Sequence, residues 1–168
     1  MTGLPKPIIA SINGVAAGAG LSLALAADIR IMSSSAKLVE AFAAIALVPD
    51  SGGTFFYTRM LGYAKAFEFA TRNGQFSAEE ALALGLVNSI VSPDVLEVAT
   101  RTLAEEYAAG PTLSFGYVKH LLHAAQHSSL HTMLDLESEY QQKAGESYDY
   151  HEGVQAFREK RTPRFEGR

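Results

Sequence analysis

The chain has 168 residues, of which 48% are hydrophobic, and this supplies enough apolar material for the core of a globular protein. Its 14 basic and 18 acidic residues give a net charge of -4 and form no basic stripe, which argues against nucleic acid as a partner. The absence of cysteine excludes disulfide bonds, zinc–thiolate sites and a thiol nucleophile.

No segment of the sequence predicts a membrane span. The most apolar stretch, Val15 to Ala27, consists mainly of alanine and glycine, includes Ser22 and stops at Asp28, so it is too short to cross a bilayer. The first residues lack the long apolar region and the cleavage site of a signal peptide. We therefore expect a cytoplasmic protein without a membrane partner.

The first quarter of the chain alternates strand-like and helix-like segments. Residues 7–14 form a β-branched run that ends in a turn signal, which predicts a buried strand. The small residues from Gly18 to Gly20 predict a turn, and a helix is expected from there to about Ala27. Residues 28–32 and 37–40 are predicted as strands. Strand, helix and strand joined by short links are typical of an α/β domain.

Further along, the pattern changes from mixed to helical. Ser77 and Glu80 fit a capping box, so a short helix is expected that ends at Gly85. From Asp94 onward the sequence predicts only helices, several of them amphipathic. We therefore divide the chain into an α/β part, residues 1–92, and a helical part, residues 93–168. The other predicted elements are a turn over 48–53, helices over 54–61 and 63–72, and a strand over 86–91.

The turn over residues 13–20 is the sharpest local feature. It consists of residues with little or no side chain, placed between a strand and a helix. Backbone N–H groups at such a helix start can hold an anion or a carbonyl oxygen that becomes negatively charged. The alternative is that the glycines and alanines only allow tight helix packing, and spacing alone favours that alternative.

Asp50 is the second candidate, because it lies between a proline turn and the paired glycines that open a helix. A carboxylate there could act as a general base if apolar neighbours such as Phe42, Leu47 and Phe55 remove it from water and raise its pKa. The alternative is a helix cap, since aspartate is a favoured residue at that position. The sequence alone leaves both possibilities open.

Two other kinds of site are disfavoured. His120, His123 and His127 have helical spacing, but no acidic residue completes an HExxH pattern, so solvated or interface histidines are the better interpretation than zinc ligands. Ser22 lies in an apolar helix without a nucleophile elbow, so no catalytic triad can be built on it. We therefore predict no metal site.

A series of motifs follows a fixed order along the chain: residues 5–20 (PKPIIASINGVAAGAG), 26–30 (AADIR), 48–54 (VPDSGGT), 76–82 with 85–88, and 152–157 with 160–165. Together they resemble the enoyl-CoA hydratase/isomerase, or crotonase, family. The resemblance implies a crotonase-like ββα spiral, of which this chain would supply the back part. A helical C-terminal oligomerisation region would follow and would build a homo-trimer or a hexamer.

The same resemblance implies an acyl-CoA thioester as substrate, with coenzyme A present only as part of that substrate and no metal or redox cofactor. Family members stabilise an enolate oxygen with two backbone N–H groups. By position one of them is the N–H of Ala19, and the other belongs to a segment before residue 1. The resemblance assigns substrate-binding roles to Ala17, Gly18, Gly20, Phe42, Pro49, Lys160 and Phe165.

The chain departs from the hydratases of the family at two positions. Ser22 and Phe42 stand where hydratases carry the two glutamates that add water, and Glu40, two residues along a strand, would not reproduce the position of Phe42. The run from Phe42 to Gly53 looks most like the ring-epoxide and enoyl isomerases of phenylacetyl-CoA breakdown, in which the aspartate that matches Asp50 is the acid/base.

The resulting hypothesis is an isomerase in which Ala19 and Asp50 carry the catalysis. One aspartate suffices to move a proton, whereas hydration must also activate water. A second hypothesis is a non-catalytic fragment or partner subunit that binds CoA thioesters weakly and serves assembly. A third is an enoyl-CoA hydratase.

Overall fold

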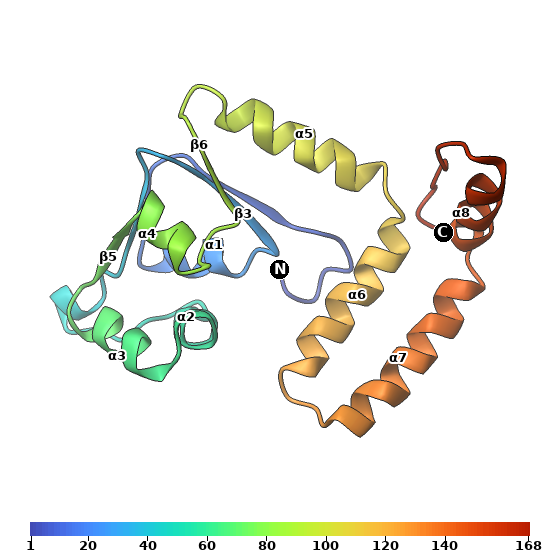
Figure 1. The fold of residues 1–168 in the computed structure, drawn as a ribbon. Coiled ribbons are helices and arrows are strands. Elements are labelled where there is room, and N and C mark those ends of the chain that lie inside the picture. The colour runs from blue at the N-terminus through green and yellow to red at the C-terminus, as the bar shows by residue number, and fades with distance from the viewer. The chain divides into compact units, whose positions relative to one another are not determined.

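Six strands, eight α-helices and one 3-10 helix make up the chain in the computed structural model, which describes residues 1–168 (Figure 1). These elements form two compact units. The first unit consists of Met1–Thr2 and Ile8–Thr102, and the second consists of Gly3–Pro7 and Leu103–Arg168. The division falls within helix α5 (Leu96–Ala108), beyond the last strand. The domain boundary predicted after residue 92 stays a prediction.

The first sheet of the first unit is parallel, with the strand order β1-β3-β6. Strand β1 (Ile9–Ile12) pairs with β3 (Ile29–Ser33), and β3 pairs with β6 (Ser89–Val91). The pairing of Ile9 with Ile29 sets the register. Isoleucines dominate these strands, and parallel strands covered on both faces typically have such apolar sequences. All three predicted strands are therefore confirmed: β1 and β6 are shorter than predicted, and β3 is shifted by one residue.

The second sheet combines both strand directions. Strand β4 (Lys37–Val39) pairs parallel with β2 (Val15–Ala17) and antiparallel with β5 (Gln75–Ser77). Strands β2 and β5 were not predicted, because strands of three residues are too short to show alternation. The predicted strand over 7–14 thus ends at Ile12, and the chain enters a second sheet after the Asn13-Gly14 turn.

Five helical segments belong to this unit: α1 (Ala19–Leu25), a 3-10 helix η1 (Ala43–Ile45), α2 (Gly53–Leu61), α3 (Tyr63–Thr71) and α4 (Ala78–Ala83). The predicted capping box is confirmed at α4. The backbone N–H of Ser77 donates to the Glu80 carboxylate at 2.8 Å, and the backbone N–H of Glu80 donates to the Ser77 hydroxyl at 3.2 Å. Both groups would otherwise lack partners at the helix start.

A buried arginine ends α1 at Leu25, slightly before the predicted Ala27. The Arg30 guanidinium donates to the carbonyl oxygens of Ala27 at 2.5 Å and Leu25 at 3.4 Å, and also to that of Leu86 at 2.6 Å. Carbonyls at a helix end have no partner within the helix, so this side chain satisfies them. It also ties the end of α1 to the segment before β6.

The core of the first unit lies between its sheets and its helices. Tyr57 and Phe69 pack edge to face, with ring centroids 5.7 Å apart, and Phe69 stacks on Phe76 at 4.7 Å. Such aromatic pairs add to the stabilisation that burial alone provides. The other members of this core are Ile12, Leu21, Leu25, Met32, Ala36, Leu38, Ala66, Ala78, Ala81, Leu86 and Val87.

The second unit is helical, as predicted. After α5 it contains α6 (Thr112–Ala125), α7 (Leu130–Gly145) and α8 (Tyr148–Glu159), and Figure 1 shows α6 and α7 side by side. Serine hydroxyls cap the last two helices. The buried Asp149 carboxylate accepts from the backbone N–H groups of Glu166 and Gly167, which fixes the C-terminal segment on α8. No helix combines the length and hydropathy that a membrane span requires.

Candidate active site

The Gly18 turn opens α1 and is held by the neighbouring sheet. Gly18 has φ 51° and ψ -118°, a conformation that L side chains rarely adopt. Its N–H donates to the Val39 carbonyl oxygen at 3.0 Å, and its own carbonyl accepts from the Ser22 N–H at 3.0 Å. Ala19 is the first residue of α1, so its N–H has no acceptor within the helix.

The Phe42 ring covers this turn. A Cβ atom placed on Gly18 would lie 3.4 Å from two carbons of that ring. The structure therefore brings together two of the predicted substrate-binding residues, and it shows why the turn needs glycine. Among the remaining predicted binding residues of the first unit, Ala17 and Gly20 are exposed and Pro49 is half-buried.

Asp50 lies in the loop between η1 and α2. It does not cap α2: the helix begins at Gly53, Gly52 occupies the cap position and no side chain bonds there. The carbonyl oxygen of Asp50 accepts from the Gly53 N–H at 2.9 Å, and Ser51 and Gly52 both have positive φ. Of the two sequence interpretations, the helix cap is thus wrong for this residue.

The condition under which the sequence allowed Asp50 to have a raised proton affinity, burial by Phe42, Leu47 and Phe55, is not met in this chain. The Asp50 side chain is exposed, Leu47 is 57% exposed, and Phe55 stacks under the Arg59 guanidinium, 3.5 Å from its ring centroid. Phe42 instead packs on Gly18. Sequence proximity suggested a cluster, but the turn at Ser51 and Gly52 and the start of α2 direct these side chains elsewhere.

Gly53 lies close to α1. A Cβ atom there would lie 2.5 Å from the Ser22 hydroxyl oxygen and 3.3 Å from a ring carbon of Tyr57. Ser22 is 2% exposed and its hydroxyl donates to the Gly18 carbonyl oxygen at 3.3 Å. This serine is therefore a packing residue, and its contact with Gly53 places the Asp50 loop beside the helix that Ala19 opens.

Glu40, which the sequence interpretation set aside, is the buried carboxyl group of this region. It is 1% exposed, and its Oε1 accepts from the Phe42 N–H at 3.0 Å. Burial, and to a lesser extent the charge of Asp50, raises the pKa of Glu40, while backbone N–H groups of Phe42 and Ala41 act in the opposite direction. One signal was available in the sequence, because strand alternation places Glu40 on the same face as the buried Leu38.

Tyr57 lies close to this carboxyl group. Its side chain is 2% exposed, and its hydroxyl is buried without a hydrogen-bond partner. Burial, together with the negative charge of Glu40, raises the pKa of Tyr57 to about 12, so the hydroxyl keeps its proton at neutral pH. A buried polar group without a partner costs about 1–3 kcal/mol, which makes this hydroxyl unusual in a packed core.

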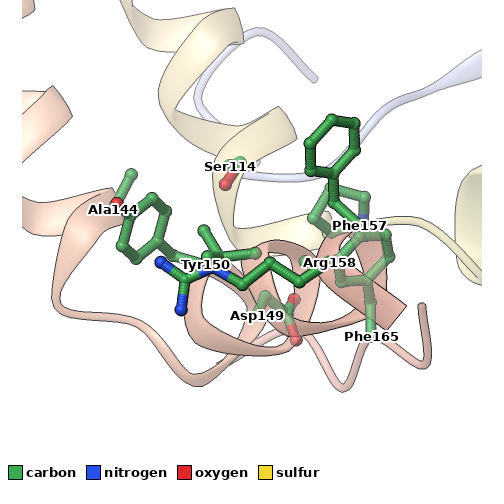
Figure 2. A pocket seen from close by; sticks show the side chains of 10 residues that line it. Ser114, Ala144, Asp149, Tyr150, Phe157, Arg158 and Phe165 are labelled. Atoms are coloured by element: carbon green, nitrogen blue, oxygen red, sulfur yellow. The ribbon is translucent and has the colours of Figure 1, made fainter. Parts of the chain in front are cut away.

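The predicted C-terminal binding residues lie in the second unit. Lys160 is exposed and has the left-handed conformation that ends α8, with φ 54°. Phe165 packs near Gly153 and lines an apolar pocket of about 470 Å³ (Figure 2). Phe157, which is 85% exposed, lies at this pocket as well, whereas Lys160 does not line it. Every lining residue belongs to the second unit, so the pocket contains neither Ala19 nor Asp50.

The histidines of α6 were considered as metal ligands in the sequence, and in the structure one of them makes an aromatic contact. The His120 ring lies 5.0 Å from that of Tyr140 on α7. No three His, Asp or Glu side chains of the chain come together in a way that could hold a metal ion. His120 thus contacts the neighbouring helix, whereas His127 lies beyond the end of α6.

Comparison with known proteins identifies the family. The model of the enoyl-CoA hydratase/isomerase family matches residues 1–168, so the chain belongs to this family. It is 46% identical over 165 residues to 1,2-epoxyphenylacetyl-CoA isomerase of Escherichia coli (strain K12), with 98% of this chain and 63% of that protein covered. It is also 46% identical to a probable enoyl-CoA hydratase of Rhodobacter capsulatus, with 98% and 64% covered.

Solved structures confirm the fold. An enoyl-CoA hydratase from Bacillus anthracis superimposes with a TM-score of 0.94 at 36% sequence identity, and the match covers 99% of this chain and 65% of that one. The predicted crotonase-like α/β fold with a helical C-terminal part is therefore correct. The chain spans just under two thirds of the length of the curated relatives, 63% and 64%. Their names include both isomerase and hydratase.

Proposed function

We propose that this chain acts on acyl-CoA thioesters as an isomerase, with Asp50 as the acid/base and the Ala19 N–H as an oxyanion donor. The observation that carries this proposal is that the side chains beside the Gly18 turn, Ser22 and Phe42, are not carboxylates. Where a hydratase would present carboxylates, Ser22 is buried in packing and Phe42 covers Gly18. The carboxyl groups that remain nearby are those of Asp50 and Glu40, and only Asp50 is exposed.

The proposed reaction moves one proton. The Asp50 carboxylate removes a proton from carbon, and the electrons of that C–H bond flow into the thioester carbonyl, whose oxygen becomes negatively charged. The Ala19 N–H stabilises this oxygen, because a fixed donor aimed at developing charge favours the transition state. Asp50 then returns the proton to a different carbon, which shifts a double bond. The same two groups could serve the rearrangement of a ring epoxide.

This chemistry needs no water and no metal or redox cofactor, and coenzyme A enters only as part of the substrate. Binding of the thioester would involve the residues around the turn, and Lys160 and Phe165 from the second unit are proposed to contact the CoA part. We also propose that the enzyme works in the cytoplasm.

The test is an isomerase assay with 3-enoyl-CoA and ring-derived CoA thioesters, monitored by the absorbance of the conjugated product. Asp50→Asn should remove activity, since an amide cannot take up the proton. Asp135→Asn, at a position of α7 whose side chain is 75% exposed, is the matched control and should keep full activity. Full isomerase activity of Asp50→Asn would refute the assignment.

A hydratase is the second candidate, because a relative named a probable enoyl-CoA hydratase is as similar as the isomerase, at 46% identity. Neither Ser22 nor Phe42 can act as a general base toward water. We therefore expect negligible hydration of crotonyl-CoA, and efficient hydration by the pure chain would favour the hydratase. Weak binding of CoA thioesters without turnover of any substrate would favour a non-catalytic partner subunit.

A further inference from the structure

The backbone of Phe42 is held on both sides. Its N–H donates to the carboxyl oxygen Oε1 of Glu40 at 3.0 Å. Its carbonyl oxygen accepts from the N–H groups of Ile45 at 3.1 Å and Leu47 at 3.0 Å. A side chain supplies the first of these bonds, whereas the other two belong to the backbone of η1 and the loop that follows. Phe42 is therefore fixed at the point where the chain leaves β4.

The ring of Phe42 lies with its outer edge on the Gly18 turn. Gly18 is buried, and a Cβ atom placed on it would lie 3.4 Å from both Cε2 and Cζ of the ring. The same turn is bound to the residue before Glu40, because the Gly18 N–H donates to the Val39 carbonyl oxygen at 3.0 Å. Residues 39–42 thus contact the turn twice, through a backbone bond and through the ring. Glu40 lies between these two contacts.

Glu40 is anchored where its carboxyl group can form the bond to Phe42. Its backbone N–H donates to the Gly74 carbonyl oxygen at 2.9 Å, and the residue is 1% exposed. A methionine or leucine would fill the same space without the cost of burying a polar group. Those side chains lack an acceptor for the Phe42 N–H. The bond to Phe42 is therefore a contact that only a polar side chain supplies at this position.

We propose that Glu40 is a positioning residue of the candidate site: its carboxyl oxygen holds the Phe42 backbone so that the ring stays on Gly18 and forms an apolar wall next to Ala19. The inference rests on the proposed function, in which the Ala19 N–H is the oxyanion donor. Gly18 and Ala19 are consecutive, so a ring that rests on the first stands next to the second. Phe42 is only half-buried, so part of it stays accessible to a ligand. Glu40 itself touches no substrate.

An apolar wall at this place supports the stabilisation of an enolate. A hydrogen bond to a negatively charged oxygen is stronger where water is excluded, because the local dielectric constant is lower. A ring that moved away from Gly18 would admit water, which competes for the Ala19 N–H. By fixing the ring, Glu40 strengthens the donor, while Asp50 remains the carboxylate that exchanges a proton with the substrate.

The first test needs no substrate. In the full 168-residue chain, NMR measures the nuclear Overhauser effect between the Phe42 ring protons and the Gly18 Hα protons, which Phe42→Leu identifies by its loss. Glu40→Met removes the acceptor at similar volume, so this effect should weaken and the Phe42 N–H should exchange with solvent at least roughly fivefold faster. Glu40→Gln keeps an acceptor oxygen and should preserve both. Glu40→Leu replaces Glu40→Met if that variant does not fold. Absence of the effect in wild type, or wild-type strength in the apolar variant, overturns the proposal.

The second test determines whether Glu40 acts through Phe42. In the isomerase assay, Glu40→Met should lower kcat about tenfold, whereas Glu40→Gln should stay within about twofold of wild type. The loss should vanish in the Phe42→Leu background, because the ring that Glu40 positions is then absent. A loss that persists beside Phe42→Leu, or one that Glu40→Gln shares, overturns the proposal. If the wild-type chain isomerises no substrate, the proposed function fails, and the NMR contact still decides whether Glu40 holds the ring.

Discussion

The Gly18 N–H donates to the Val39 carbonyl oxygen at 3.0 Å, and this bond fixes the turn before α1 against the end of β4. It joins the second sheet to the helix whose first N–H is the proposed oxyanion donor. The bond also requires the backbone conformation of Gly18, with φ 51° and ψ -118°. A residue with a Cβ atom cannot adopt this conformation without strain.

Gly18→Ala should therefore impair both stability and activity. We expect a loss of about 1–3 kcal/mol in the free energy of unfolding, because the conformation is strained for alanine and the new methyl group meets the Phe42 ring at 3.4 Å. Gly20→Ala is the matched control: a Cβ atom there meets nothing within 4 Å, and its φ is not positive. Chemical denaturation of both variants checks the prediction, and equal stabilities would contradict it.

Ala19→Pro should remove activity while the fold survives. Proline is tolerated at the first position of a helix, where the N–H has no partner within the helix, so α1 can still form. The variant lacks the donor that the mechanism requires. Loss of one oxyanion donor typically lowers kcat by about 100-fold to 1,000-fold. Turnover numbers, measured after thermal melting has verified folding, provide the check, and unchanged turnover would exclude the Ala19 N–H from catalysis.

The sequence predicted those features that depend on local pattern. Isoleucine-rich strands, the small-residue turn at Gly18 and the capping box at Ser77 all appear in the structure, because each is encoded by neighbouring residues. The family motifs covered the whole chain and indicated the fold. Strands β2 and β5 were missed because their partners are distant in sequence and each has only three residues.

The environments of Asp50 and Glu40 in the candidate site could not be predicted from the local sequence. The surroundings of Asp50 were inferred from residues close in sequence, whereas the side chains near it are set by the turn at Ser51 and by contacts of α2 with α1. In the sequence, Glu40 was considered only as a replacement for the glutamate that hydratases carry at the position of Phe42, and it was rejected because it lies two residues away along the strand. Strand alternation places it on the face of Leu38, but how deeply that face is buried depends on how β4 packs against β2, β5 and α4.

The pH dependence of stability should reveal the burial of Glu40. Its pKa is raised in the folded chain, so the folded state binds this proton more tightly than the unfolded state. The resulting stabilisation is complete below the unfolded value, 4.5, and is lost as the pH rises through the higher folded value. Glu40→Gln lacks this loss. The melting temperature of the variant relative to wild type should therefore increase from pH 4 to pH 8, and a constant difference would contradict the assignment.

The contribution of Glu152 to stability should depend on pH in the opposite direction. The Glu152 side chain is 9% exposed and forms two bonds with Arg161, at 2.6 and 2.9 Å, and it accepts from the Arg164 N–H. The Arg161 guanidinium, followed by that N–H, lowers the pKa of Glu152 from 4.5 to about 2. Its stabilisation is thus present above pH 4.5 and is lost as the pH falls to about 2.

Glu152→Gln tests this contribution. The variant should melt below wild type at pH 7, and the difference should shrink as the pH falls from 4.5 towards 2. Glu146→Gln is the control: Glu146 is an exposed acidic residue whose only bond is to Gln142. Parallel melting curves of wild type and Glu152→Gln at all pH values would show that the ion pair does not stabilise the C-terminal segment.

Assembly is the last prediction, and it concerns the apolar side chains that the second unit leaves exposed. Phe157 is 85% exposed, and Val118, Leu122, Leu130 and Leu134 are each more than half exposed. A partner that packs on these helices would remove large apolar side chains from water. We expect copies of this chain to cover them, so light scattering at micromolar concentration should give a trimer or hexamer.

Phe157→Asp should shift that mass towards the monomer. The side chain contributes little to the core of its own unit, so the fold should persist, while a charge in an apolar interface is costly. Gln141→Asp, at an exposed polar position of α7, adds the same charge and should keep the assembly. Truncation after Gly145 removes α8 and should abolish the assembly if α8 contributes the interface. A monomer mass for the wild-type chain, or an oligomer that survives Phe157→Asp and the truncation alike, would rule out this surface as the contact.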